Sequence, residues 1–346
     1  MAEKKKLTAL SELGEFGLIE HLTKNIKLKN ASSLKGVGDD AAVIGEGDGV
    51  KLVTTDLLIE GIHFDMVYTP LRHLGYKAVV VNLSDIAAMN GKAEQVTFSV
   101  SLSSKYSLEA IEELYKGAYL ACETYGVDLV GGDTTASPAG LFIAVTAIGT
   151  AEKDRVVYRN TARKNDLICV SGDLGSAYMG LLILEREKKA YKANPEMQPR
   201  LSGHEYLLER QLKPEARIDI LKALAGAKVL PTAMIDISDG LASDVMHIGK
   251  QSRLGCTLYE DKLPINQDTI KLCQDFDISS VTAALNGGED YELLFTVAQE
   301  DYEKIKDIMG ISIIGHMSDF SEGMHLVTKL GQQIALQAQG WDALKK

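Results

Sequence analysis

The segment Leu71–Met89 has the sequence LRHLGYKAVVVNLSDIAAM. It is apolar and contains several alanine and valine residues, but it also carries the polar residues Asn82, Ser84 and Asp85. Its periodicity fits a buried helix and a buried strand, because apolar residues occupy every face. Its length favours the helix, since buried strands are usually shorter. We therefore predict a helix over this segment.

Strands and helices surround this segment in the first half of the chain. An arm and a short helix near Glu15–Asn25 come before it. Glycine, with 31 residues against seven prolines, supplies most of the turns. We predict a helix at Leu108–Tyr125, whose apolar residues fall on one broad face, and strands at Ala41–Ile44, Val50–Thr55, Gln95–Leu102, Asp128–Val130 and Leu141–Ile148.

A second block of elements begins near residue 150, and we place a domain boundary at Gly149–Asp154. The expected domains are residues 1–150, for ATP and metal binding and dimerisation, and residues 151–346, which complete the cleft. The polar segment Lys188–Gly203 is predicted to be a mobile surface loop. The mixture of elements indicates two α/β or α+β domains. In the second block we predict strands at Leu167–Val170, Met234–Ile237, Cys256–Tyr259, Tyr291–Val297, Ile311–Ile314 and His325–Val327, and helices at Ser176–Glu187, Glu205–Leu212, Glu215–Ala225, Leu241–Gln251, Asp268–Asp275 and Asp301–Met309.

Composition and charge exclude several classes of protein. Hydrophobic residues make up 45% and charged residues 25% of the chain, which excludes disorder of its bulk. The 37 basic and 48 acidic residues give a net charge of −11, which disfavours generic binding to nucleic acid or to an anionic membrane. We find no membrane-spanning run and no secretory signal, so we expect a cytoplasmic protein. The four cysteines are too widely spaced for a disulfide framework or a cysteine-rich zinc site.

Acidic residues recur beside glycine or hydroxyl residues where hydrophobic runs end. Such positions place carboxylates on loops that strands hold rigidly. Carboxylates that converge repel one another, which raises their pKa values unless a cation is present. Their hard oxygens select Mg²⁺ or Mn²⁺, and Mg²⁺ commonly joins one or two carboxylates to substrate phosphates. We therefore predict metal-assisted phosphoryl transfer from a nucleotide, carried by GVGDD (36–40), TTD (54–56), NLSD (82–85), GGDTT (131–135), DISDG (236–240) and GGEDYE (287–292).

Each of these motifs has a simpler explanation when it is taken alone. A single aspartate after a strand is more often a turn or helix-cap residue, and Asp39, Asp173 and Asp239 fit that description. Gly172–Gly175 either cradles a phosphate at a helix N-terminus or simply packs. The chain has no Walker motif, no dinucleotide-binding glycine pattern after its first strand and no protein-kinase signature. The number of acidic motifs favours a site only if they meet in space.

Three further residues have a functional and a structural interpretation. Arg159 is suited to contact a phosphate with two nitrogens, although a solvated surface arginine is commoner. His63 follows the TTD motif by seven residues and lines the same cleft or is a satisfied structural histidine. Trp341, the only tryptophan, packs the tail down or stacks on a flat heterocycle.

Together these segments resemble the thiamine-monophosphate kinases, a family in the superfamily of aminoimidazole ribonucleotide synthetase and selenophosphate synthetase. The order and spacing of the matching motifs cover nearly the whole chain, and the combination is highly specific. The segment Lys188–Gly203 fits the family pattern poorly. The matching motifs are GEF (14–16), GDD (38–40), TTD (54–56) with His63, YKA (76–78), NLSDIAAM (82–89), GGDTT (131–135), DISDGL (236–241) and GGEDYEL (287–293).

The resemblance implies ATP-dependent phosphorylation of thiamine phosphate to thiamine diphosphate, with Mg²⁺. Asp56, Asp85 and Asp133 would be the catalytic residues. Glu289 would offset the thiazolium charge and Trp341 would stack on the pyrimidine ring. The resemblance assigns to Mg²⁺ the residues Asp40, Thr54, Thr55, Asp56, Asp85, Asp133, Asp236 and Asp239, to ATP the residues Tyr115, Gly132, Asp133, Arg159 and Ser238, and to thiamine phosphate the residues His63, Glu289 and Trp341.

The resemblance also implies an architecture and an assembly. The family pairs an α/β N-terminal domain, whose sheets form a barrel across a homodimer, with an α+β C-terminal domain. Two alternatives remain: a sister ATP-dependent synthetase of the same superfamily, and a non-catalytic sensor of thiamine phosphate. The chain has no cysteine before Cys122 and ends in Leu-Lys-Lys, which disfavours the sister enzymes that use a terminal or early reactive cysteine.

Overall fold

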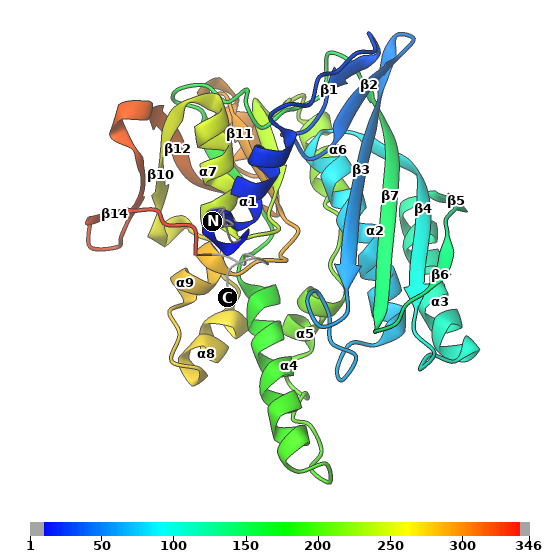
Figure 1. The fold of residues 1–346 in the computed structure, drawn as a ribbon. Helices are drawn as coiled ribbons and strands as arrows, with labels where there is room; N and C mark the ends of the chain where they lie inside the picture. The colour runs from blue at the N-terminus through cyan, green and yellow to red at the C-terminus, as the bar shows by residue number, and fades with distance from the viewer. Residues whose placement is uncertain (1–9, 340–346) are drawn as a thin grey trace, which may run out of the picture.

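The computed structural model describes residues 10–339 and shows two seven-stranded sheets, one in each half of the chain (Figure 1). Helices pack on both sheets, which confirms the predicted two-domain fold of mixed sheets and helices. None of the helices in this range is long and apolar enough to cross a membrane.

The N-terminal sheet has the strand order β1-β2-β3-β7-β4-β5, with β6 beside β4. Its pairs are antiparallel, except that β5 and β6 run parallel to β4. The sheet does not close on itself within residues 10–339, so a barrel would require a second copy. The elements of this half are α1 (Leu10–Thr23), β1 (Ser33–Lys35), β2 (Ala42–Glu46), β3 (Gly49–Ile59), α2 (Leu71–Ala88), β4 (Lys92–Leu102), α3 (Leu108–Tyr125), β5 (Asp128–Gly131), β6 (Thr134–Ala136) and β7 (Leu141–Glu152).

Helices α2 and α3 cover one face of this sheet, and two glycines bring them together. A Cβ on Gly75 would lie 1.8 Å from the carbonyl oxygen of Leu114, and a Cβ on Gly117 would lie 1.9 Å from that of Arg72. Glycine at both positions therefore lets the two backbones touch. Along β7 buried residues alternate with partly exposed ones, because successive side chains of a strand point to opposite faces.

The C-terminal sheet has the strand order β14-β13-β10-β12-β8-β11-β9. The paired strands β8 and β11 are almost fully buried and mostly apolar. The elements of this half are β8 (Leu167–Ser171), α4 (Ser176–Ala193), α5 (Glu205–Leu212), α6 (Ile218–Gly226), β9 (Ala233–Asp236), α7 (Leu241–Ser252), β10 (Leu254–Tyr259), η1 (Glu260–Lys262), α8 (Gln267–Asp275), α9 (Ser280–Asn286), β11 (Leu293–Val297), η2 (Gln299–Asp301), α10 (Tyr302–Ile305), β12 (Ile311–Asp319), η3 (Phe320–Glu322), β13 (Met324–Val327) and β14 (Gln333–Ala335).

Helix α2 joins the two halves, and its 18 residues include 14 that are buried. Most of it lies in the N-terminal core, whereas Ala88 packs in a core of C-terminal residues that includes Cys169 and Phe295. The helix predicted for Leu71–Met89 is therefore confirmed, and it has no exposed apolar face because both domains pack around it.

One prediction about the second half is wrong, and one helix was not predicted. Helix α4 continues to Ala193, so Lys188–Ala193 is helical and the irregular segment begins later than expected. Lys188 pairs with Glu185 one turn before it and with Asp65 of the other domain, at 2.9 and 2.8 Å. These pairs support a helical turn that looks like a polar loop in the sequence. Helix α9 was not expected, because its seven residues are too few to show a helical period.

Candidate active site

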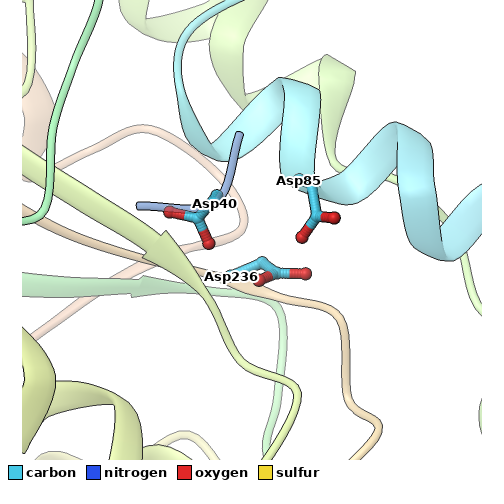
Figure 2. A group of neighbouring side chains, drawn as sticks. All are labelled: Asp40, Asp85 and Asp236. Atoms are coloured by element: carbon cyan, nitrogen blue, oxygen red, sulfur yellow. The ribbon is translucent and has the colours of Figure 1, made fainter. Parts of the chain in front are cut away.

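Three carboxylates from distant parts of the chain converge between the two sheets. Asp40 precedes β2, Asp85 lies in the last turn of α2 and Asp236 ends β9. Their ligand oxygens lie within 4.8 Å of one another, and Figure 2 shows the carboxyl groups pointing toward a common space. The structure therefore brings together three of the eight residues predicted to bind metal, and we call these three the cleft carboxylates.

Hydroxyl groups on neighbouring elements hold these carboxylates in place. Thr54 of β3 donates a hydrogen bond to Asp85, with 2.6 Å between Oγ1 and Oδ2. Ser84 of α2 donates to Asp236, also at 2.6 Å. Two consecutive residues of α2 thus contact both domains. Ser84 donates to Asp236 of the C-terminal sheet, and Asp85 accepts a hydrogen bond from Thr54 of the N-terminal sheet.

The alternation of β3 decides which predicted residues reach the cleft. Thr54 and Asp56 share the helix-covered face with Leu52 and Leu58, which are buried. Thr55 points to the opposite face, where its hydroxyl donates to the carbonyl of Val145. Two consecutive strand residues cannot both face one cation, so the structure does not bring Thr55 to the cleft carboxylates.

Burial disfavours ionisation of Asp56, Asp85 and Asp236, and the charges of neighbouring acids add to this for Asp85 and Asp236. Burial raises the pKa of Asp56 to about 6. Burial and then the charge of Asp40 raise the pKa of Asp236 to about 8, and burial and then Asp236 raise that of Asp85 well above its usual value. A divalent cation would offset both effects, since it lowers the cost of burying the charges and of placing them together.

Arg159 is the cation that the chain itself supplies to this cleft. Its guanidinium binds both carboxylate oxygens of Asp40, with 2.8 Å between Nε and Oδ2, and the second contact comes from Nη2. The backbone N–H of Arg159 donates to Asp39 at 3.2 Å. Asp39 is buried beside Arg159 and Lys35, and burial raises its pKa, so it is more than a surface turn residue.

A cavity of about 140 Å³ adjoins the cleft carboxylates. The Nδ1 atom of His63 accepts a hydrogen bond from the backbone N–H of Ile59 at 3.0 Å, so a neutral ring carries its proton on Nε2. The lining includes predicted metal, nucleotide and substrate residues, and it consists of Asp56, Leu57, Leu58, His63, Val81, Asp85, Asp236, Ser238, Glu289 and Tyr291.

Glu289 is held at the wall of this cavity by two residues to which the sequence analysis assigned no role. The ammonium of Lys77 lies 2.9 Å from its Oε1, and Gln211 donates to Oε2 at 2.5 Å. Lys77 is buried and also donates to the carbonyl of Gln211 at 3.0 Å. Glu289 itself has a positive φ of 64°, a conformation that costs free energy in a residue other than glycine.

Four predicted residues lie away from the cleft carboxylates or outside the described range. Tyr115 packs against Phe98, with 5.2 Å between ring centroids. Gly132 and Asp133 are exposed between β5 and β6, on the far side of β7 and β4 from β3. Trp341 lies outside residues 10–339. The assignments of these four residues remain predictions.

The glycine turn before α4 is occupied by the protein itself. The carboxylate of Asp290 accepts hydrogen bonds from the backbone N–H groups of Gly175 and Ala177, at 2.7 and 3.3 Å. Asp173 accepts from the hydroxyls of Ser176 and Tyr206. The structure therefore favours the packing interpretation of Gly172–Gly175, because a carboxylate already caps the helix where a phosphate would bind.

The donor set of the cleft fits a hard divalent cation. All the groups that converge are carboxylate or hydroxyl oxygens, and no sulfur or imidazole ligand lies within the group of three. Oxygen donors of this kind select Mg²⁺ or Mn²⁺ over Zn²⁺ or Cu²⁺.

Two family models match the chain. AIR synthase related protein, N-terminal domain, matches residues 38–151, and AIR synthase related protein, C-terminal domain, matches residues 165–323. The thiamine-monophosphate kinase of Bacillus subtilis (strain 168) is 32% identical over 339 residues, which is 96% of this chain and 100% of that protein. The thiamine-monophosphate kinase of Aquifex aeolicus (strain VF5) is 35% identical over 302 residues, 87% of this chain and 92% of that protein.

Solved structures share the fold. AaThiL complexed with AMPPCP and TMP superposes with a TM-score of 0.83 at 32% identity and covers 99% of both chains. The thiamine-monophosphate kinase of Stenotrophomonas maltophilia K279a gives 0.71 at 32% identity and covers 91% of this chain and 96% of that one. The hydrogenase maturation protein HypE in complex with ATP gives 0.69 at 18% identity, a likeness of fold alone.

Proposed function

The chain belongs to the thiamine-monophosphate kinase family of AIR synthase related proteins, and we propose that its acidic cleft transfers the terminal phosphoryl group of ATP to thiamine phosphate. The product is thiamine diphosphate. The observation that carries this function is the meeting of Asp40, Asp85 and Asp236 beside a cavity, in a chain that superposes on a relative bound to AMPPCP and TMP.

The residues of the cleft suit the approach of two polyanions. The acceptor oxygen belongs to a phosphate that is largely ionised at pH 7, so the reaction does not need a strong general base. We propose that Asp40, Asp85 and Asp236, with Asp56 beside them, hold Mg²⁺, which neutralises phosphate charge when bound. Arg159 and Ser238 then orient the phosphates of ATP, because both lie at the cleft carboxylates or at the adjoining cavity.

His63 and Glu289, which also line the cavity, are proposed to orient thiamine phosphate. The N–H of Ile59 donates to Nδ1 of His63, which fixes the orientation of its ring at the cavity. The ion pair with Lys77 holds the carboxylate of Glu289 in place. We propose that this carboxylate orients the cationic thiazolium as well as offsetting its charge. The proposal assigns Trp341 to the pyrimidine ring on the family resemblance alone.

We also propose that the chain acts as a homodimer through the uncovered face of its N-terminal sheet. Leu57 on this face is 52% exposed, and Thr55 and Thr146 form a hydroxyl pair at 3.1 Å beside it. Asp133 is separated from β3 by β7 and β4, which amounts to about 14 Å of strand spacing. In this arrangement Gly132 and Asp133 serve the nucleotide site of the second copy.

A mixture of two inactive variants tests that arrangement. Asp85→Asn and Asp133→Asn, unfolded and refolded together, give mixed dimers in which one of the two sites is intact if Asp133 acts on the other copy. Random pairing then restores about a quarter of wild-type activity. A mixture as inactive as its components would show that Asp133 acts within its own chain.

A coupled assay of ADP release tests the activity itself. The chain should release ADP with thiamine phosphate and Mg²⁺, and not with free thiamine, because the acceptor is a phosphate oxygen. Comparable turnover with free thiamine would refute the substrate assignment. Binding of thiamine phosphate without ADP release would identify a sensor, and turnover only with another acceptor would identify a sister synthetase.

The transfer is proposed to be direct and in line. The described cysteines are buried and unpaired, and burial raises the pKa values of all four thiols, which makes them poor nucleophiles. A carboxylate that holds Mg²⁺ is also a poor nucleophile. Chiral γ-thiophosphate ATP should give inversion at phosphorus, and net retention would instead indicate a phosphoenzyme.

A further inference from the structure

A group of polar side chains joins the segment of residues 60–70, between β3 and α2, to helix α4 of the other domain. The ammonium of Lys188 lies 2.8 Å from Oδ2 of Asp65, and the hydroxyl of Tyr68 donates to Oε1 of Glu185 at 2.9 Å. Lys188 also donates to both oxygens of Glu185, at 2.9 and 3.2 Å. Its ammonium is 5.6 Å from the centre of the Tyr68 ring, within the range of a cation–π contact. We call Asp65, Tyr68, Glu185 and Lys188 the α4 network.

The segment that this network holds is the one that carries His63. The carboxylate of Asp65 connects the inside of the segment to α4, because Oδ1 accepts from the backbone N–H of Val67 at 2.8 Å while Oδ2 faces Lys188. His63 lies only two residues before Asp65, so a shift of Asp65 would also displace the imidazole. The position of His63 at the cavity therefore depends on the contact with α4.

The cavity lies between the two domains, so its width depends on contacts that cross the boundary. His63 lines it from the N-terminal domain and Glu289 from the C-terminal domain. At the cleft carboxylates, the hydrogen bond from Ser84 to Asp236 fixes the distance between the domains. Burial raises the pKa of Tyr68, and the charge of Glu289 is among the further causes, so Tyr68 lies close enough to Glu289 to sense its charge. The α4 network therefore joins the domains on the side of the cavity where thiamine phosphate is proposed to bind.

The simpler explanation is an ion pair that only adds stability at the domain boundary. Single exposed pairs contribute little, because water screens the charges and the side chains lose freedom, whereas several charges in one network hold a geometry better. The side chains of Lys188, Asp65 and Glu185 are 17, 25 and 33% exposed, so water reaches them only in part. One ammonium thus contacts two carboxylates and an aromatic ring, an arrangement suited to hold the segment against α4.

We propose that Glu185 and Lys188 are positioning residues for thiamine phosphate, which act from α4 through the segment that carries His63. The inference rests on the proposed function for the identity of the substrate, and it adds two residues of α4 to that function. The network holds His63 at the distance from Glu289 that thiamine phosphate requires. The reacting phosphates lie at the cleft carboxylates, outside the network, so its loss should weaken the binding of thiamine phosphate more than it slows the transfer.

Steady-state kinetics of Lys188→Met and Lys188→Arg test the proposal in the full chain. Methionine removes the ammonium, whereas arginine keeps a cation that can pair with both Asp65 and Glu185. We expect methionine to raise the KM for thiamine phosphate about three- to fivefold, and to change kcat and the KM for ATP by less than about twofold. Arginine should recover most of the loss. Equal increases in both KM values, no increase in either, or an arginine variant no better than methionine would overturn the proposal.

Matched variants separate positioning from a general effect on α4. Lys189→Met changes the next lysine of the helix, which is exposed, and it should leave both KM values unchanged. Asp65→Asn should raise the KM for thiamine phosphate as Lys188→Met does. The double variant should lose no more than either single one, since the two residues act through one contact. Additive losses would mean that they act separately and would contradict the proposal.

Hydrogen exchange of the peptide that spans residues 60–69 supplies a measurement without turnover. Lys188→Met should speed exchange in this peptide, and Lys189→Met should not. If Lys188→Met fails to fold, Tyr68→Phe replaces it, because it removes only the hydroxyl. It should speed exchange and raise the same KM by a smaller factor, and no change in either would refute the role of the network. Wild type that releases no ADP with thiamine phosphate would refute the proposed function and with it the substrate named here, whereas the KM outcomes above refute the role of the α4 network alone.

Discussion

Two groups of buried acids in this molecule differ in how their charges are compensated. The cleft carboxylates face one another, and Arg159 binds only one of them. In the C-terminal domain, Glu292 lies between two arginines: Arg210 binds Oε1 at 3.0 Å and Arg217 binds Oε2. We call Glu292, Arg210 and Arg217 the arginine-paired cluster.

This difference indicates that Glu292 stabilises the fold, whereas the cleft carboxylates are arranged to bind a cation. Glu292 is 1% exposed and also accepts a hydrogen bond from Ser171, so both its oxygens have partners. Asp85 and Asp236 in the cleft have raised pKa values and no arginine bound to them in the described residues. Removing Glu292 should therefore destabilise the fold, whereas removing an acid of the cleft should relieve repulsion. The predictions below test this contrast.

The largest effect is expected in the arginine-paired cluster. Glu292→Gln should lower the free energy of unfolding by about 3–5 kcal/mol, because it removes the buried carboxylate that pairs with both guanidinium groups. Asp290 at 3.8 Å and Asp219 at 2.8 Å remain as the charge partners of Arg210 and Arg217. Urea denaturation of the metal-free protein measures the change, and Glu303→Gln, an exposed acid in α10, is the control. A loss similar to that of the control would remove the distinction between the two groups.

The next effect concerns catalysis in the cleft. Asp56→Asn and Asp85→Asn should each lower kcat by at least roughly 100-fold, or about 2.7 kcal/mol, since each removes a group that positions the reacting phosphates. Activity should also require Mg²⁺ or Mn²⁺ and vanish with a chelator. Neither variant should be less stable than wild type without metal. Near-normal turnover in both would exclude these residues from the metal site.

The cleft should also make the metal-free protein sensitive to pH. Asp56 and Asp236 have pKa values raised from 3.8 to about 6 and about 8, so between pH 4 and 8 the folded chain holds protons that the unfolded chain has released. Raising the pH through this window should therefore reduce the free energy of unfolding. Thermal melts in chelator should show the loss, and saturating Mg²⁺ should abolish it. Stability that rises over this window would contradict the assignment.

The smallest effect sharpens the role of Arg159. Its guanidinium competes with a divalent cation for Asp40, so Arg159→Gln should bind Mn²⁺ several-fold more tightly without nucleotide, by about 1 kcal/mol. The same variant should bind AMPPCP more weakly. Calorimetric titration measures both, with the more exposed Arg155→Gln as the control. Weaker Mn²⁺ binding in Arg159→Gln would mean that the arginine supports the metal rather than competing with it.

The sequence predicted the elements and motifs of the cleft well, because each is a local pattern. The long apolar helix and the DISDG motif at the end of β9 lie where the pattern indicated, whereas the TTD motif, predicted at the end of a strand, lies within β3, which continues to Ile59. The face of the sheet on which each residue of this motif lies could also have been predicted. Side chains alternate along a strand, so Thr55 points to the face opposite Thr54 and Asp56. The sequence analysis assigned Thr54, Thr55 and Asp56 to Mg²⁺ alike, because it followed the family motif and not the two-residue period of a strand.

Other features of the site depend on contacts that no local pattern records. Lys77 meets Glu289 across 212 positions of sequence, and Asp290 caps a helix that begins 114 residues before it. Pairings of this kind are fixed by the docking of two domains, which a single sequence does not display.

Helix α2 also has a consequence for the lengths that this chain can tolerate. One inserted residue rotates everything after it by about 100°. Within α2 such an insertion would carry Ser84 away from Asp236 and Asp85 away from Thr54 at the same time. After α4, the exposed turn at residues 195–199 has no such partners in either sheet. A library of random insertions selected for activity should therefore be empty across α2 and well populated at that turn, which makes the turn the natural place for an epitope or a fluorescent label.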